Sequence, residues 1–173
     1  MRILTTTVTQ LVLHQLPENP VAPPDDGRDY TVLRVRKMPL DYYRFLYMAV
    51  GRPHHWTSRI LPDASLRREI HAANVRMRVL YSDGAPAGWF ELDVGRAPRD
   101  TRLVHFAILP DFRGRGLARH LLSQAIVAGF EDQPSALTVE TNTLDHPAAL
   151  PLYRKMGFRP VSTRDVSTPA FEE

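Results

Sequence analysis

The residue pattern with the clearest chemical meaning is an arginine- and glycine-rich run, Arg113-Gly114-Arg115-Gly116-Leu117-Ala118. It follows an apolar segment that ends at Leu109 and opens a segment in which apolar residues recur at helical spacing. Glycines let the backbone pass close to a ligand, and the first amides of a helix are unpaired donors at the positive end of its dipole. The run therefore predicts a loop that binds an anion, with a pyrophosphate as the expected ligand.

Two familiar phosphate-binding loops do not match this run. A P-loop needs Lys and then Ser or Thr after its second glycine, and Leu117 and Ala118 stand there instead. The dinucleotide-binding fingerprint needs a small residue where this chain has Arg119. The pattern thus argues against ATP and NAD as ligands. A basic turn that caps a surface helix is the other interpretation, and the neighbouring elements decide between the two.

The elements around the loop follow from the spacing of apolar residues. Alternating or continuous apolar runs predict strands within residues 1–16 and over 30–36, 75–81, 87–94, 102–109, 136–141 and 158–164. Helical spacing predicts helices over 39–50, 64–73, 117–130 and 147–156, the second with Asp63 as its N-cap. Asp83-Gly84 predicts a hairpin turn, so the strands between 75 and 109 should be consecutive and antiparallel. The anion loop then lies at the carboxyl end of a strand, where α/β sheets usually bind ligands.

Length and composition indicate one folded domain over residues 1–173, with an N-terminal strand and a proline-rich loop within residues 1–29. There is no cysteine, which excludes thiol nucleophiles, disulfides and cysteine-ligated metals. The first 16 residues contain no small-residue cleavage site, and no apolar run is long enough to span a bilayer. We therefore expect a soluble, cytoplasmic protein that does not associate with membranes.

The basic charge could indicate a nucleic-acid-binding site and the histidines a metal site, but the spacing of these residues favours neither. The net charge is +3 and the pI about 9.5, but the arginines are spread without a dense basic block, so nucleic-acid binding ranks last and an anionic cofactor accounts for the excess. His54, His55, Asp63 and His71 match no compact set of metal ligands. We expect no metal and no nucleic-acid partner.

The anion loop, the strand after its helix and a later run, Leu152-Tyr153-Arg154-Lys155-Met156-Gly157-Phe158, together resemble the GNAT superfamily of acyl-CoA-dependent N-acyltransferases. The core of the resemblance covers residues 75–165. Residues 141–158, TNTLDHPAALPLYRKMGF, are also similar to a bacterial branch in which a Leu-Asp-His-Pro-x-Ala-Leu run precedes the tyrosine. Four further residues match a pattern of that branch: Leu46, Tyr47, Val50 and Gly51. The resemblance implies an α/β (α+β) fold whose mixed, mostly antiparallel central sheet has helices on both faces.

The resemblance also implies where acetyl-CoA binds. Amides of the anion loop would hold the CoA pyrophosphate while two arginines add charge, and a strand splayed from its neighbour would pair its backbone with the pantetheine arm. Asn142 stands where relatives often place a residue that binds the cofactor or the acceptor, although an asparagine that forms a turn is the other interpretation. The implied cofactor-binding residues are Phe106, Ala107, Ile108, Arg113, Gly114, Arg115, Gly116, Leu117, Ala118, Asn142 and Tyr153.

The implied reaction is transfer of an acetyl group from acetyl-CoA to a primary amine of a small molecule or protein, by direct attack in a ternary complex. Such a transfer needs a deprotonated amine, a polarised thioester carbonyl and a proton for the departing thiolate. By its position in the later run, Tyr153 is the family's proton donor. A phenol with a pKa of about 10 stays protonated near neutral pH and could supply that proton. A tyrosine buried in the core is the alternative.

The general base is open between two residues. Strand alternation places Trp89, Glu91 and Asp93 on one face, which makes Glu91 the first choice, against a solvated strand glutamate. Many relatives carry a glutamate near the start of the next strand, where this chain has Arg102. His105 on that strand is the second choice, and a packed histidine is its alternative interpretation. His146 is expected to serve the helix start before Pro147.

The acceptor and the oligomeric state are not determined by the sequence. Aromatic residues at 42, 43, 47 and 56 border the acceptor pocket in relatives, so either the acceptor is apolar or aromatic or these residues are core. Arg102 favours an alternative function, a non-catalytic module that binds or senses acyl-CoA, whereas Tyr153 argues against it. A homodimer is compatible with the sequence, and the acyl group is acetyl or longer.

Overall fold

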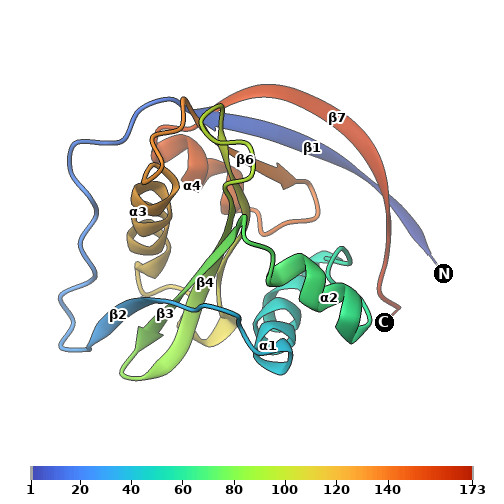
Figure 1. Cartoon of the computed structure of the whole chain (residues 1–173), viewed down its shortest axis with the longest axis horizontal. Helices are drawn as coiled ribbons and strands as arrows, with labels where there is room; N and C mark the ends of the chain where they lie inside the picture. The colour runs from blue at the N-terminus through green and yellow to red at the C-terminus, as the bar shows by residue number, and fades with distance from the viewer. Residues whose placement is uncertain (1, 173) are drawn as a thin grey trace.

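The computed structural model describes residues 2–172, so Met1 and Glu173 of the predicted domain lie outside the described residues (Figure 1). The strands are β1 (Ile3–Leu13), β2 (Tyr30–Arg34), β3 (Val75–Ser82), β4 (Ala85–Asp93), β5 (Thr101–Ile108), β6 (Leu137–Asn142) and β7 (Arg159–Pro169). The helices are α1 (Leu40–Gly51), α2 (Asp63–Ile70), α3 (Leu117–Gly129) and α4 (Ala149–Lys155), and 3₁₀ turns occupy Arg52–His54 and Pro110–Phe112. Every predicted strand and helix is present, and β7 ends five residues later than expected.

The strands form one sheet in the order β2-β3-β4-β5-β6-β1-β7. All neighbours are antiparallel except β5 and β6, which run parallel. A hydrophobic core lies on each face of the sheet. On one face α3 and α4 pack with Phe90 and Leu92, and on the other α1 and α2 pack with Trp89. This confirms the mixed, mostly antiparallel sheet with helices on both faces, and the alternation predicted along β4 (Figure 1).

The N-terminal strand lies inside the sheet. Residues Val8–Leu13 of β1 pair with β6, while β1 pairs along nearly its whole length with β7. The segments Ile3–Thr7 and Asp165–Pro169 therefore continue past β6 as a two-stranded ribbon, which Figure 1 shows arching toward α2. Beyond the ribbon, the Phe171 amide donates to His55 Nδ1 at 3.0 Å. The C-terminal end of the described chain thus contacts the segment that follows α1.

A β-bulge in β5 marks the point where the sheet opens. Glu91 is opposite His105 but the next residue, Leu92, is opposite Leu103, so Val104 is an extra residue in β5. Pairing between β5 and β6 ends at the same place, because Leu103–Val139 is its last pair. Beyond the bulge the two strands diverge, and no strand within residues 2–172 pairs with the β6-facing edge of residues 105–108. This is the splay that the resemblance implied.

Two local predictions have different outcomes. The hairpin turn is confirmed, with φ of +48° at Asp83 and +82° at Gly84, which is a type I′ geometry. The N-cap assignment for Asp63 is wrong, since Pro62 precedes the helix and Asp63 is its first residue. The Asp63 carboxylate instead accepts a hydrogen bond from Arg44 at 2.7 Å. No helix within residues 2–172 is long and apolar enough to cross a bilayer.

Candidate active site

A cavity of about 650 Å³ lies where β5 and β6 diverge. The anion loop (residues 113–118) forms part of one wall, and the segment after α1 and the β1–β7 ribbon form others. Ten of the eleven predicted cofactor-binding residues line it: Phe106, Ala107, Ile108, Arg113, Gly114, Gly116, Leu117, Ala118, Asn142 and Tyr153. The exception is Arg115, whose guanidinium stacks over the Phe112 ring at 5.0 Å. The structure thus brings the predicted residues together in one cavity, with Arg115 outside its lining.

The loop before α3 has the geometry of an anion-binding turn. Gly114 and Gly116 both have φ of +76°, a left-handed conformation that side chains disfavour. A Cβ at Gly114 would meet no atom within 4 Å, so the backbone conformation rather than lack of space calls for glycine there. No side chain caps the start of α3, which leaves its first amides available as donors. With Arg113 adding positive charge, this end of the cavity suits a pyrophosphate.

Tyr153 reaches the cavity from α4, in the apolar core between the sheet and that helix. Its ring packs edge-on against Phe106 and Phe158, at centroid distances of 6.2 and 5.8 Å. Burial, and to a smaller extent the charge of Asp145, raises the pKa of its phenol. The hydroxyl therefore stays protonated at neutral pH, which a proton donor requires.

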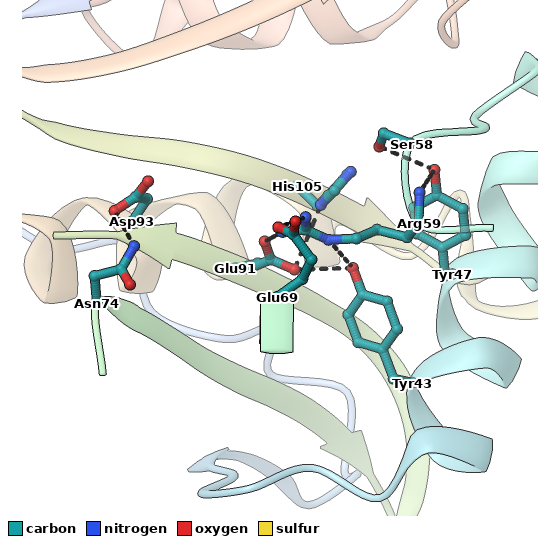
Figure 2. A network of polar contacts seen from close by, with 9 residues as sticks. All are labelled: Tyr43, Tyr47, Ser58, Arg59, Glu69, Asn74, Glu91, Asp93 and His105. Atoms are coloured by element: carbon teal, nitrogen blue, oxygen red, sulfur yellow. Dashed lines mark hydrogen bonds and ion pairs between the residues drawn. The ribbon is translucent and has the colours of Figure 1, made fainter. Parts of the chain in front are cut away.

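Glu91 lies at the centre of a buried polar network between β4 and the segment that joins α1 to α2 (Figure 2). Its side chain is fully buried. Tyr43 Oη donates to Glu91 Oε1 at 2.9 Å, and the Arg59 guanidinium donates to Glu91 Oε2. Arg59 also donates to Glu69 Oε2 at 3.0 Å and to Tyr43 Oη at 3.2 Å. The network anchors the segment after α1 to the sheet.

The surroundings of Glu91 bear on its predicted role as base. Burial by itself raises the pKa of a carboxyl group, but His105 and the Arg59 guanidinium favour the carboxylate more strongly and lower the pKa of Glu91 to about 2. A carboxylate that accepts from a phenol and from a guanidinium cation has little tendency to take a proton. This position favours a role in orienting a neighbour over a role as the base, and the assignment itself stays a prediction.

His105 is that neighbour. Its Nδ1 is buried without a hydrogen-bond partner within residues 2–172 and lies 3.5 Å from Glu91 Oε1. Its ring packs against Tyr47, Trp56 and Trp89 at centroid distances of 5.4, 5.2 and 5.7 Å. In Figure 2 the other ring nitrogen points away from Glu91. His105 also lines the cavity, so a histidine whose Nδ1 faces a buried carboxylate meets the space where the strands diverge.

The loop between β6 and α4 is bound to the segment after α1 across the cavity. Trp56 Nε1 donates to Asp145 Oδ1 at 2.9 Å, and His54 Nδ1 lies 2.9 Å from the Leu144 carbonyl. Asn142 Oδ1 accepts from the Leu144 amide at 2.8 Å, so the turn-forming interpretation describes its side chain, although the residue also lines the cavity. His146 Nδ1 accepts from the Ala148 amide at 3.1 Å in the turn before α4, which begins at Ala149 and not at residue 147 as predicted.

Sequence reasoning missed two residues that shape the site. Arg59 stands in an irregular segment, where no periodicity indicates that its guanidinium turns back toward the sheet. Asp145 carries a local signal, because a short polar side chain after a strand commonly forms a turn; its Oδ2 accepts from Thr141 Oγ1 and the Asn142 amide at 2.8 and 2.9 Å. Its bond to Trp56 is a long-range contact that no such signal predicts.

The aromatic residues divide between core and cavity. Tyr47 and Trp56 line the cavity, whereas Tyr43 is fully buried in the core. Tyr42 lies outside the lining, with its Oη 2.8 Å from Tyr81 Oη. Two of these residues therefore line the cavity and two do not, and the nature of the acceptor stays a prediction. Within residues 2–172 no group of three or more His, Cys, Asp or Glu side chains is placed to hold a metal ion.

Comparison with known proteins identifies the family of this chain. Residues 42–168 match a model described as the acetyltransferase (GNAT) domain. A Bacillus subtilis protein, named as a candidate alanine N-acetyltransferase for ribosomal protein bS18, is 31% identical over 90 residues, which are 50% of this chain and 55% of the relative. This chain thus matches about half the length of that protein.

Solved structures share the fold at low sequence identity. A candidate GNAT acetyltransferase from Novosphingobium aromaticivorans has a TM-score of 0.63 and 20% identity, covering 96% of this chain and 65% of its own. AAC(6')-Iy, solved with the bisubstrate analogue CoA-S-monomethyl-acetylneamine, has a TM-score of 0.52 and 18% identity, covering 76% of this chain and 91% of its own. Because the family model spans most of this chain, the chain belongs to the GNAT acetyltransferase family.

Proposed function

We propose that this protein transfers an acetyl group from acetyl-CoA to a primary amine of a small molecule or protein, by direct attack in a ternary complex. The family uses acetyl-CoA as its acyl donor. The observation that carries the proposal is the single cavity between β5 and β6, which is lined by the anion loop, Tyr153 and His105. One cavity therefore brings together a glycine turn at a helix start, a phenol whose pKa is raised by burial, and a histidine beside a buried carboxylate.

The donor would lie along the diverging strand. In this proposal the amides of residues 114–118 and the charge of Arg113 hold the CoA pyrophosphate, while the free edge of Phe106, Ala107 and Ile108 pairs with the pantetheine arm. The absence of Arg115 from the cavity lining supports a smaller, long-range role for that residue than for Arg113. Asn142 would contribute by shaping the wall near Tyr153.

His105 is the base in this mechanism, and Glu91 orients it. The amine loses a proton to the outer nitrogen of His105, its nitrogen forms a bond to the thioester carbonyl carbon, and the C–S bond then breaks. Tyr153 donates its proton to the departing thiolate, so the products are an amide and CoA thiol. Transfer of the proton held by His105 back to the Tyr153 phenolate through solvent restores both residues. Glu91 stabilises the imidazolium by its charge, as a buried carboxylate beside a histidine does in acyl-transfer enzymes.

An assay of thiol release from acetyl-CoA tests this function. The acceptors should include small aliphatic and aromatic amines, free amino acids, and peptides that begin with alanine, since the Bacillus subtilis relative is named for that terminus. Amine-dependent release of CoA together with an acetylated product in mass spectrometry is the expected result. Binding of acetyl-CoA without turnover on any amine would instead support the non-catalytic acyl-CoA-binding module and refute the proposed transfer.

A further inference from the structure

A second cavity, of about 430 Å³, lies between the sheet and α2. Charged residues dominate its walls, which include Arg59, Glu69 and Glu91. The two cavities share four wall residues: Ser58, Arg102, Val104 and His105. His105 and the bulge thus stand at the boundary between the apolar cavity of the cofactor and a polar one.

The polar cavity offers a route to His105 that avoids the cofactor. On the other side, the contacts from Trp56 to Asp145 and from His54 to Leu144 tie the segment after α1 to the loop after β6. All four of these residues line the larger cavity, so these contacts bridge two of its walls. An amine that enters through the polar cavity beside α2 therefore reaches His105 while the contacts between these two walls stay intact.

The bulge determines which charged residue the amine meets. Strict alternation would place residues 102 and 105 on opposite faces of β5, but the extra residue Val104 puts Arg102 opposite Asp93 and on the same face as His105 and Glu91. Leu103 and Phe106, three positions apart, both face the core beneath α3, which agrees with this change of register. Arg102 therefore belongs to the boundary that His105 also forms.

The positive charge of Arg102 is poorly neutralised. Its side chain is 45% exposed, and its one ion-pair contact within residues 2–172 is with Glu140 at 4.0 Å. Both Glu140 oxygens already accept from Arg164, at 3.0 and 2.9 Å. The opposite residue, Asp93, makes no ion pair with Arg102 within residues 2–172; its Oδ1 accepts from two neutral donors, Asn74 Nδ2 and the Gly95 amide, each at 2.8 Å. By contrast, Arg59 in the same cavity is paired with Glu91 and Glu69.

We propose that Arg102 binds a carboxylate of the acceptor, so that the acceptor is an amine that also carries a carboxylate, as a free α-amino acid does. This inference rests on the proposed acetyl transfer and names its substrate class. A guanidinium presents a planar pair of donors that matches a carboxylate, and it disfavours acceptors with several positive charges. The rings of Tyr47 and Trp56 beside His105 offer contacts for an apolar or aromatic side chain.

Matched pairs of acceptors test this inference: L-phenylalanine against L-phenylalaninamide, and L-leucine against L-leucinamide. The ratio of kcat/KM for the acid to that for the amide is measured in the wild type, in Arg102→Gln and in Arg102→Glu. Comparing ratios between variants cancels the different basicity of the two amines. Arg99→Gln is the matched control, because Arg99 is 70% exposed and lines neither cavity.

We expect the acid-to-amide ratio to fall by about 10-fold or more in Arg102→Gln, because a charge-assisted hydrogen bond is lost. The ratio should fall further in Arg102→Glu and stay at the wild-type value in Arg99→Gln. A ratio that is the same in all four proteins overturns the inference while leaving the transfer activity intact. Acetylation of polyamines alone overturns it too. An enzyme that acetylates no amine refutes the proposed function itself.

Discussion

His105 Nδ1 lies 3.5 Å from Glu91 Oε1 on the neighbouring strand, and the two residues are direct partners in the register of β4 and β5. The bulge at Val104 begins immediately before His105, so the pair stands where the sheet opens into the cavity. Glu91 and His105 are alternatives for one role when only the sequence is considered. Their geometry instead suggests two connected roles, with the carboxylate behind the imidazole and the imidazole facing the acceptor.

A pH–rate profile separates these roles. In the wild type kcat/KM should fall at low pH, because the base must be unprotonated to accept the proton of the amine. We expect His105→Gln to lose this acidic limb and to lower the plateau by about 100-fold. Glu91→Gln should keep the limb with a reduced plateau, and the exposed His14→Gln should match the wild type. Loss of the limb in Glu91→Gln, with the limb retained in His105→Gln, would identify Glu91 as the base.

Replacing Tyr153 by phenylalanine tests the proton donor. Burial keeps the phenol protonated at neutral pH, and no hydrogen bond contributes to the shift of its pKa, so the ring of Tyr153→Phe should pack as before. We expect kcat to fall by about 100-fold, with little change in KM for acetyl-CoA. Tyr81→Phe, which also removes one hydroxyl but lies outside the cavity, is the control. An unchanged kcat in steady-state assays would contradict the assignment.

Arg113 and Arg115 form a matched pair for cofactor binding. Arg113 lines the cavity, whereas Arg115 stacks on Phe112 outside the lining. We expect Arg113→Gln to raise the Kd for CoA about 10-fold at low salt, because a charged hydrogen bond to phosphate is lost. Arg115→Gln should have a smaller effect that disappears at high salt. Calorimetric titration with CoA measures both, and equal losses in both variants would show that both arginines contact the pyrophosphate.

The buried ion pair of Glu91 predicts how stability depends on pH. The pKa of Glu91 is about 2 in the folded protein and near 4.5 in the unfolded chain, so its stabilising contribution is complete above about pH 5 and is lost as pH falls toward 2. At pH 7, Glu91→Gln should lower the free energy of unfolding by about 3 kcal/mol, because the charge of Arg59 is left without its buried partner. Glu69→Gln removes the exposed partner of the same guanidinium and should cost less than about 1 kcal/mol.

Urea unfolding of these two variants and the wild type between pH 7 and pH 3 provides the measurement. The difference between the wild type and Glu91→Gln should shrink as the pH falls, since protonation of Glu91 in the unfolded chain offsets its native interactions. A difference that stays constant over this range would mean that Glu91 is not a stabilising carboxylate in the folded protein.

Features that depend on residues close together along the chain could be predicted from the sequence. Helical spacing predicted all four helices, and Asp83-Gly84 predicted its hairpin, because these patterns reflect local backbone preference and one buried face. The anion loop is equally local, since two glycines and a helix start are contiguous in the chain. Asp63 shows the limit of this reasoning, because Arg44, 19 residues away, takes up the carboxylate that was expected to cap the helix.

The sequence by itself thus determined the helices and strands and the family resemblance, and it predicted the anion loop. The tertiary structure alone decided that β1 lies between β6 and β7, that Arg59 closes on Glu91, and that a single extra residue brings Arg102 to the face of His105. Each of these depends on which distant segments pair and in what register. A register change of one residue reverses the face of every side chain beyond it, and no local pattern in β5 records that change.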